Sequence, residues 1–170
     1  MNNAAKMVGG ALKSAHEVMV GTLAGLTSEQ AHHFAGGNTV PIVAHFGHVM
    51  TFEDMIVNGM LKGGKPMFMA MNTGFSELPP QQSPWAPWGL KVKADMAATM
   101  IYAMAVGAES EAYVATLDDA ALAKPLDLTS IGQGMQTVGF MLGALISNVQ
   151  WHTGEISCLK GLQGLKGYPF

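Results

Sequence analysis

The sequence has few charged residues. Asp, Glu, Lys and Arg make up only 12% of the 170 residues, about half the usual share in a globular protein. With nine Lys plus Arg and a formal net charge of −3, the chain lacks the basic surface that binds nucleic acids or anionic membranes. Hydrophobic residues make up 49%, which excludes an intrinsically disordered chain. So little charge also favours a homo-oligomer, in which apolar surface is buried between subunits.

Cysteine and long apolar segments are also scarce. Cys158 is the single cysteine, so no internal disulfide can form and no oxidising compartment is implied. Charged residues interrupt the N-terminal stretch, which makes a poor signal peptide. The longest uncharged run, 128–154, is continuously apolar only over 138–146, whereas a membrane-spanning helix needs about 20 apolar residues. We therefore expect a cytoplasmic protein that does not span a membrane.

Several familiar catalytic and binding motifs are missing. The chain has no Cys-x-x-Cys pair and no serine nucleophile elbow. The sequence Gly132-Gln133-Gly134 lacks both the lysine and the preceding strand of a phosphate-binding loop. Any chemistry must therefore come from other groups.

The pattern of apolar residues predicts four helices, over about 4–25, 39–62, 89–117 and 136–161, with a short turn of helix at 28–32. Thr39 is the expected N-cap of the second helix, with Pro41 just inside it. Between the second and third helices lies a long connection, 63–88, with five prolines. Because no convincing strand alternation appears, we predict an all-α four-helix bundle forming one domain over 1–170. The alternative is a mixed α+β domain in which the Pro-rich segment forms a hairpin.

Polar side chains interrupt the predicted apolar faces of the second and fourth helices. His45 lies on the stripe of the second helix, with His48 to one side and Glu53 to the other. The predicted inward stripe of the fourth helix contains three polar groups among apolar ones: Met141, Leu145, Asn148, His152, Glu155, Leu159 and Leu162. Buried polar groups need partners, so these side chains hydrogen-bond one another or hold water, a ligand or a metal ion. Imidazoles from facing helices with an open position are typical of catalytic metal sites.

Plainer interpretations apply to the other candidates. His16 is expected to be a hydrogen-bonded core residue. Cys158 is expected to pack rather than to act as a nucleophile. Trp85 and Trp88 either anchor the Pro-rich connection or cap a pocket.

Two segments resemble the DinB/YfiT-like superfamily of bacterial helical-bundle proteins. The stretch from Thr39 through His45 to His48 is similar to a family segment whose histidine binds metal. The stretch from Asn148 through His152 to Ile156 is similar to the signature His-x-x-x-His followed by a residue, Gly, Gln or Glu, and Ile. The resemblance covers most of the chain in element order, with about a dozen residues in the specific motifs.

The resemblance implies a four-helix bundle, often a homodimer, in which three histidines bind nickel or zinc. It implies a small-molecule substrate and, in some relatives, a low-molecular-weight thiol, with transferase, isomerase or hydrolase activity. His45 and His152 match two of the metal ligands. Asn148 stands where the family has the third histidine, and an amide oxygen is a weaker ligand. His48 or Glu155 would be the replacement ligand, and Glu155 is also a candidate general base. The alternative is a metal-free member that binds a small molecule or serves as a stress-associated scaffold.

Overall fold

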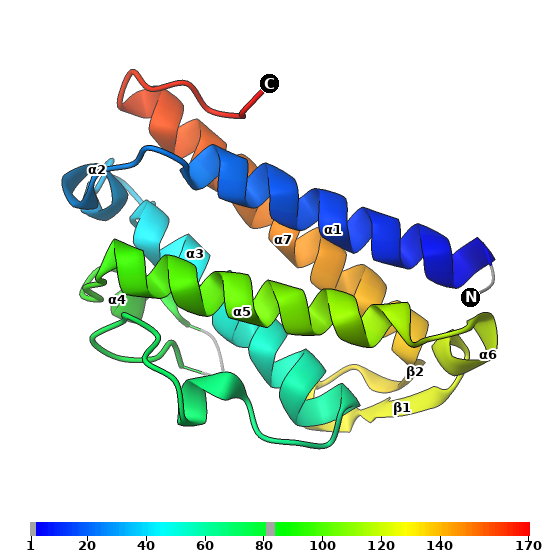
Figure 1. Cartoon of the computed structure of the whole chain (residues 1–170). Coiled ribbons are helices and arrows are strands. Elements are labelled where there is room, and N and C mark those ends of the chain that lie inside the picture. The colour runs from blue at the N-terminus through cyan, green and yellow to red at the C-terminus, as the bar shows by residue number, and fades with distance from the viewer. Residues whose placement is uncertain (1–2, 81–83) are drawn as a thin grey trace.

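The computed structural model describes residues 3–80 and 84–170, and most of these lie in helices. Four long helical segments dominate: α1 (Asn3–Leu23), α3 (Ile42–Asp54) continuing as the π-helical η1 (Met55–Leu61), α5 (Met96–Ala115) and α7 (Val138–Leu162). Both α1 and α3 pack against α5 and against α7 (Figure 1). Fully buried side chains from all four segments, such as Leu12, Phe46, Tyr102 and Leu145, form one hydrophobic core. The chain is therefore predominantly helical, as predicted.

Helix ends follow local side-chain chemistry. The predicted short helix is α2 (Ser28–His32), where Thr27 and Gln30 form a reciprocal capping box. The second long helix begins later than predicted, at Ile42, because Pro41 is its N-cap and the Thr39 hydroxyl donates to the carbonyl of Gly36 instead. Its end at Leu61, just before Gly63, agrees with the prediction.

The segment between η1 and α5 contains the short helices η2 (Met67–Met69) and α4 (Ala86–Gly89). The predicted start of the third helix at about residue 89 is wrong, because Gly89 ends α4 and α5 begins at Met96. Asp95 sets that start, since its carboxylate accepts the backbone N–H groups of Ala97 and Ala98. Gly89 lies so close to α3 that an added Cβ would stand 2.9 Å from the Cβ of Ala44.

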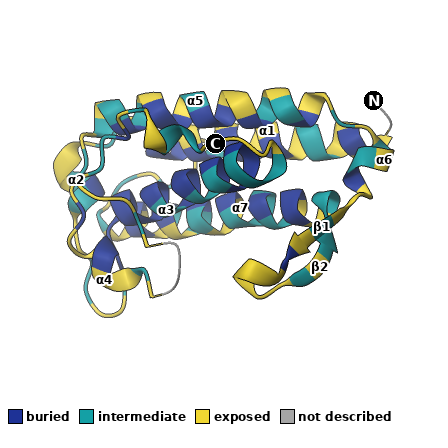
Figure 2. Cartoon of the chain, turned by 90° about the horizontal axis from the view of Figure 1, so that it is seen from below, coloured by how far each residue is buried: buried dark blue, intermediate teal, exposed yellow. Residues whose placement is uncertain are grey.

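A small antiparallel hairpin was not predicted. After α6 (Asp119–Leu122), strand β1 (Pro125–Leu128) pairs with β2 (Gly134–Thr137), and the short helix η3 (Thr129–Ile131) lies in the connection between them. The hairpin lies at the end of the molecule where α7 begins (Figure 2). Gly132, at φ +78°, makes the turn possible. Strands of four residues give little alternation to detect, and the mixed-domain alternative placed its hairpin in the Pro-rich segment instead.

The buried stripe of α7 differs from the predicted one. Met141, Leu145 and Leu159 are buried as expected, but the rest of the buried face is made by Leu142, Val149, Thr153, Ile156 and Lys160. Asn148 and His152 are half-buried, and Glu155 and Leu162 are exposed. The polar trio therefore lies at the edge of the core, where charged groups can keep contact with solvent.

None of the helices in the described ranges has an apolar stretch long enough to cross a lipid bilayer.

Candidate metal centre

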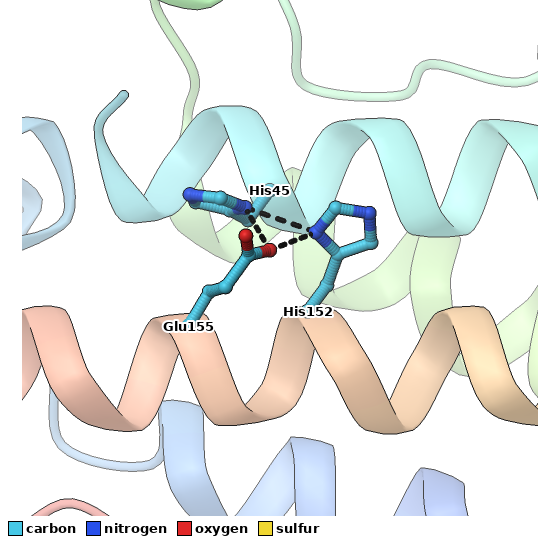
Figure 3. A group of neighbouring side chains, drawn as sticks. All are labelled: His45, His152 and Glu155. Carbon is cyan, nitrogen blue, oxygen red and sulfur yellow. Dashed lines mark hydrogen bonds and ion pairs between the residues drawn. The ribbon is translucent and has the colours of Figure 1, made fainter. Parts of the chain in front are cut away.

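Two histidines and a glutamate converge between α3 and α7 (Figure 3). The Nδ1 atoms of His45 and His152 lie 3.0 Å apart. Glu155 Oε2 lies 3.1 Å from the Nδ1 of His45 and 2.5 Å from the Nδ1 of His152. His45 stands near the start of α3, whereas His152 and Glu155 are one turn apart in the second half of α7, so helix packing sets the geometry. Among the described residues, these three are the group of His, Cys, Asp or Glu side chains whose ligand atoms lie close enough together to share a metal ion.

Burial keeps His45 uncharged at neutral pH. Its side chain is 7% exposed, and burial lowers its pKa to about 4, against the opposing effect of the Glu155 carboxylate. A neutral imidazole keeps a lone pair on one ring nitrogen, which is the form that binds metal. The Glu155 side chain is 53% exposed and supplies a negative charge beside both rings.

The donor set suits a divalent ion of borderline softness. Two imidazole nitrogens and one carboxylate oxygen form the protein ligands of some catalytic zinc sites, which keep a further position open. In a tetrahedral site with bonds of about 2.1 Å the ligand atoms lie roughly 3.4 Å apart. The three observed separations, 2.5–3.1 Å, are shorter, so a bound ion requires the side chains to move apart by less than about 1 Å. The exposed Glu155 has room for that movement.

The other two predicted ligands, His48 and Asn148, lie beside this group. The His48 ring meets that of His152 edge-on, with centroids 4.9 Å apart, and stacks on Trp85 at 5.0 Å. Burial is the main cause that lowers the pKa of His48 to about 4, while the neighbouring Asn148 side chain acts to raise it. The Nδ2 atom of Asn148 is buried and has no hydrogen-bond partner among the described residues. Metal ligation by either residue stays a prediction.

Trp85, just before α4, forms an aromatic wall over the histidines. Its ring packs edge-on against His45 and His152, with centroids 5.4 and 5.8 Å apart, in addition to stacking on His48. Of the two sequence-based interpretations for this tryptophan, the structure therefore favours the wall of a site. Trp88, in contrast, is buried in a small cluster with Val40, Val43, Ala44 and Val92.

Two cavities flank the centre. One of about 360 Å³ is lined by His45 and Glu155 together with Val40, Trp85, Cys158 and Leu159. Another of about 150 Å³ lies on the His48 side, against Thr51, Phe52 and Phe68. Cys158 was expected to pack, but it is exposed and lines the first cavity. Its position one turn after Glu155 was the available sequence signal.

A second titratable cluster lies away from these cavities. The ring of His16 bridges two carboxylates, with Nε2 3.0 Å from Glu53 Oε2 and Nδ1 2.9 Å from Glu111 Oε1. Burial is the largest single effect and lowers the pKa of His16. The hydrogen bonds and charges of the two carboxylates together outweigh it, so the pKa rises to about 8. His16 is thus the hydrogen-bonded core residue that was predicted, and it ties α1 to α3 and α5.

The comparisons with known proteins agree with this fold. The model of the DinB superfamily matches residues 11–156. The chain belongs to the DinB superfamily. A solved structure of a conserved protein from Enterococcus faecalis has the same fold as this DinB protein, with a TM-score of 0.79 and 17% sequence identity. The alignment covers 95% of this chain and 98% of the other. No protein of curated function matches the sequence significantly.

Proposed function

We propose that this DinB protein is a divalent-metal-dependent enzyme that acts on a small molecule. The observation that carries the proposal is the convergence of His45, His152 and Glu155 beside a cavity of about 360 Å³. A partly buried cluster of two imidazoles and a carboxylate with direct access to a cavity is typical of catalytic rather than structural metal sites, which are closed by four protein ligands. The expected ion is nickel or zinc.

The scaffold proposed for this site is the four-helix bundle, with the Pro-rich connection as its long crossover. The bundle fixes the spacing of α3 and α7, and the connection supplies Trp85. Such a division of labour is common, because rigid helices hold ligands accurately while a connecting segment shapes the cavity.

His45 and His152 would hold the ion through Nδ1, and Glu155 would supply an oxygen ligand. A divalent ion in such a site polarises substrate oxygens and lowers the pKa of a water or thiol nucleophile. Burial of His45 keeps its ring neutral and available. Trp85 and the apolar cavity wall exclude water and orient the substrate.

Transferase and hydrolase reactions both fit this machinery, and a low-molecular-weight thiol is the cosubstrate class proposed for the first. Glu155 is also close enough to the cavity to move a proton as a general base if it leaves the ion free. We place the reaction in the cytoplasm, where Cys158 would remain reduced.

One observation favours a second candidate function, a metal-free small-molecule-binding protein. The separations of 2.5–3.1 Å among the three groups are those of hydrogen bonds. In that case the proton on one Nδ1 would be shared with the other Nδ1 and with the Glu155 carboxylate. The same cavity would then bind its ligand without metal chemistry.

Elemental analysis of the untagged protein, after loading with nickel or zinc and removal of excess ion, separates these candidates. We expect close to one metal ion per chain in the wild type, and loss of that ion in His152→Ala and in Glu155→Ala. His33→Ala is the matched control, because His33 is an exposed histidine outside the cluster. Thiol-transfer and ester- or amide-hydrolysis screens follow on the loaded protein. A wild type that retains no ion would favour the metal-free candidate.

A further inference from the structure

A further cavity, of about 280 Å³, lies where α1 and α5 pack side by side (Figure 1). It shares no lining residue with the two cavities that flank the metal centre. Most of its wall is apolar and comes from α1, α3 and α5: Met19, Val20, Met50, Ala103, Met104, Gly107 and Ala108. Three polar side chains complete it: His16, Glu17 and Glu111. An apolar hollow with a few polar groups is the usual form of a small-molecule site.

The polar part of this cavity, which we name the amine cavity, holds more negative than positive charge. Both ring nitrogens of His16 lie within 3.0 Å of a carboxylate oxygen, Nε2 of Glu53 and Nδ1 of Glu111. A neutral imidazole has only one N–H, so both contacts require the protonated ring. In agreement, the two carboxylates raise the pKa of His16 to about 8 against the lowering effect of burial. One imidazolium therefore faces two carboxylates, and one negative charge is left over.

The excess charge belongs to Glu111 rather than to Glu53. Glu53 is fully buried, and its Oε1 has no hydrogen-bond partner among the described residues, so it depends on the His16 charge. The Glu111 side chain is 36% exposed and lines the cavity. Glu17, the other acid of the wall, lies 3.9 Å from Lys13, and because both side chains are exposed that pair is weak.

We propose that the amine cavity binds a small primary amine that carries an apolar chain. The ammonium group would lie against the Glu111 carboxylate, where it supplies the missing positive charge and donates hydrogen bonds. The chain would lie along Met19, Met50 and Met104, because flexible thioether side chains adapt to apolar ligands of different shape. A metal ion does not suit this site, since the two nitrogens of His16 contact different carboxylates and do not converge on one point.

Small residues of α5 keep the amine cavity open. A Cβ added at Gly107 would stand 3.4 Å from Nδ1 of His16, so the backbone of α5 passes directly beside the ring. Ala108 follows it in the wall and is exposed at the cavity edge. A larger side chain at position 108 would therefore fill the cavity without disturbing the buried core.

Titration of the protein with hexylammonium at pH 7, followed by the NMR shifts of backbone amides, tests the charge requirement. We expect shifts confined to the cavity segments 16–20 and 103–111, with a dissociation constant of about 1 mM or lower, within the range that so small a ligand can reach. Hexanoate, which has a chain of similar length and the opposite charge, should bind at least about tenfold more weakly. Glu111→Gln should weaken hexylammonium binding by about tenfold or more. Glu109→Gln is the matched control, because Glu109 is exposed on the same helix and pairs with Lys62 outside the cavity.

The variant Ala108→Leu tests the apolar part of the cavity without changing a charge. It should abolish hexylammonium binding, whereas Ala112→Leu, at an exposed position one turn further along α5 and outside the cavity wall, should bind as the wild type does. A wild type that shows no shifts at these segments up to about 10 mM hexylammonium overturns the proposal. So does equal binding of hexanoate, or binding that survives both Glu111→Gln and Ala108→Leu. The metal centre lies between α3 and α7, so failure here leaves the proposed function untouched.

Discussion

Asn148 is the residue at which this chain differs most informatively from the family pattern. It lies one turn before His152 and interacts with His48, while its Nδ2 is left without a hydrogen-bond partner in the described structure. A buried N–H without a hydrogen-bond partner costs about 1–3 kcal/mol, so the Asn148 amide does little to stabilise the fold. We therefore expect the fold to tolerate a stronger metal ligand at this position.

We predict that Asn148→His strengthens metal binding. A third imidazole would replace an amide, which binds borderline ions weakly, and would restore the spacing of four residues to His152. The expected gain in metal affinity is roughly tenfold or more. Even residues that only hydrogen-bond to a metal ligand change the affinity by about that much. Competition with a chelating dye measures it. Gln150→His is the control, because Gln150 is exposed on the same helix. An unchanged affinity would contradict a site built around His152.

His16 gives the stability of the protein a pH dependence of known sign. Its pKa is about 8 in the folded chain against 6.5 unfolded, so protonated His16 stabilises the folded state. That contribution is fully present below about pH 6.5 and is lost as pH rises through 8. The shift of about 1.5 corresponds to at most about 2 kcal/mol. Urea unfolding at pH 6.5 and at pH 9 measures the loss, and His16→Gln should remove most of the difference. If the free energy of unfolding changed by the same amount between the two pH values in the wild type and in His16→Gln, His16 would not be the group responsible.

At the scale of elements, Asp54 joins three parts of the chain. Its buried carboxylate accepts from the Asn58 amide, from the backbone N–H groups of Met67 and Phe68 in η2, and from the Tyr102 hydroxyl of α5. Burial beside Asp54 raises the pKa of Tyr102, so its hydroxyl stays protonated and donates. One side chain therefore fixes the start of the long connection to the helices beneath it.

We expect Asp54→Ala to destabilise the protein by about 3–5 kcal/mol, because four donors would lose a charged acceptor inside the protein. The free energy of unfolding, from urea titration followed by circular dichroism, measures this. Asp118→Ala is the comparison, since Asp118 is an exposed N-cap of the short α6, and a cap is worth about 1 kcal/mol. Similar losses for the two variants would show that Asp54 does not have this connecting role.

The sequence predicted the long helices well, but it did not predict the start of α5 or the β-hairpin. Apolar spacing identified four long helical segments and the buried positions of His16 and His45, because a 3.6-residue period is a strong signal over many turns. The start of α5 and the hairpin depended on Asp95, on close packing at Gly89 and on short strands, none of which has a long period. At the site, spacing brought out His45, His152 and Glu155. Only tertiary packing shows that Glu155, rather than His48 or Asn148, meets the two Nδ1 atoms, and that Trp85 covers them.

At the scale of the whole molecule, an ion bound at the proposed metal centre would couple metal binding to the stability of the fold. An ion that binds the folded chain but not the unfolded one stabilises it by about 2.7 kcal/mol at a free concentration 100 times the dissociation constant. For a chain of this length that is a rise in melting temperature of roughly 5–10 °C. Calorimetry with and without zinc measures it, and chelation should reverse it. A shift of the same size in His152→Ala would point to binding elsewhere.

The central claim is that one divalent ion sits between His45, His152 and Glu155. The most direct test is anomalous diffraction at the zinc edge from crystals of the zinc-loaded protein. The account predicts one strong anomalous peak within about 2.3 Å of both Nδ1 atoms and of a Glu155 carboxylate oxygen. A zinc-loaded crystal with no peak there, or with peaks only at His32 and His33, would contradict it.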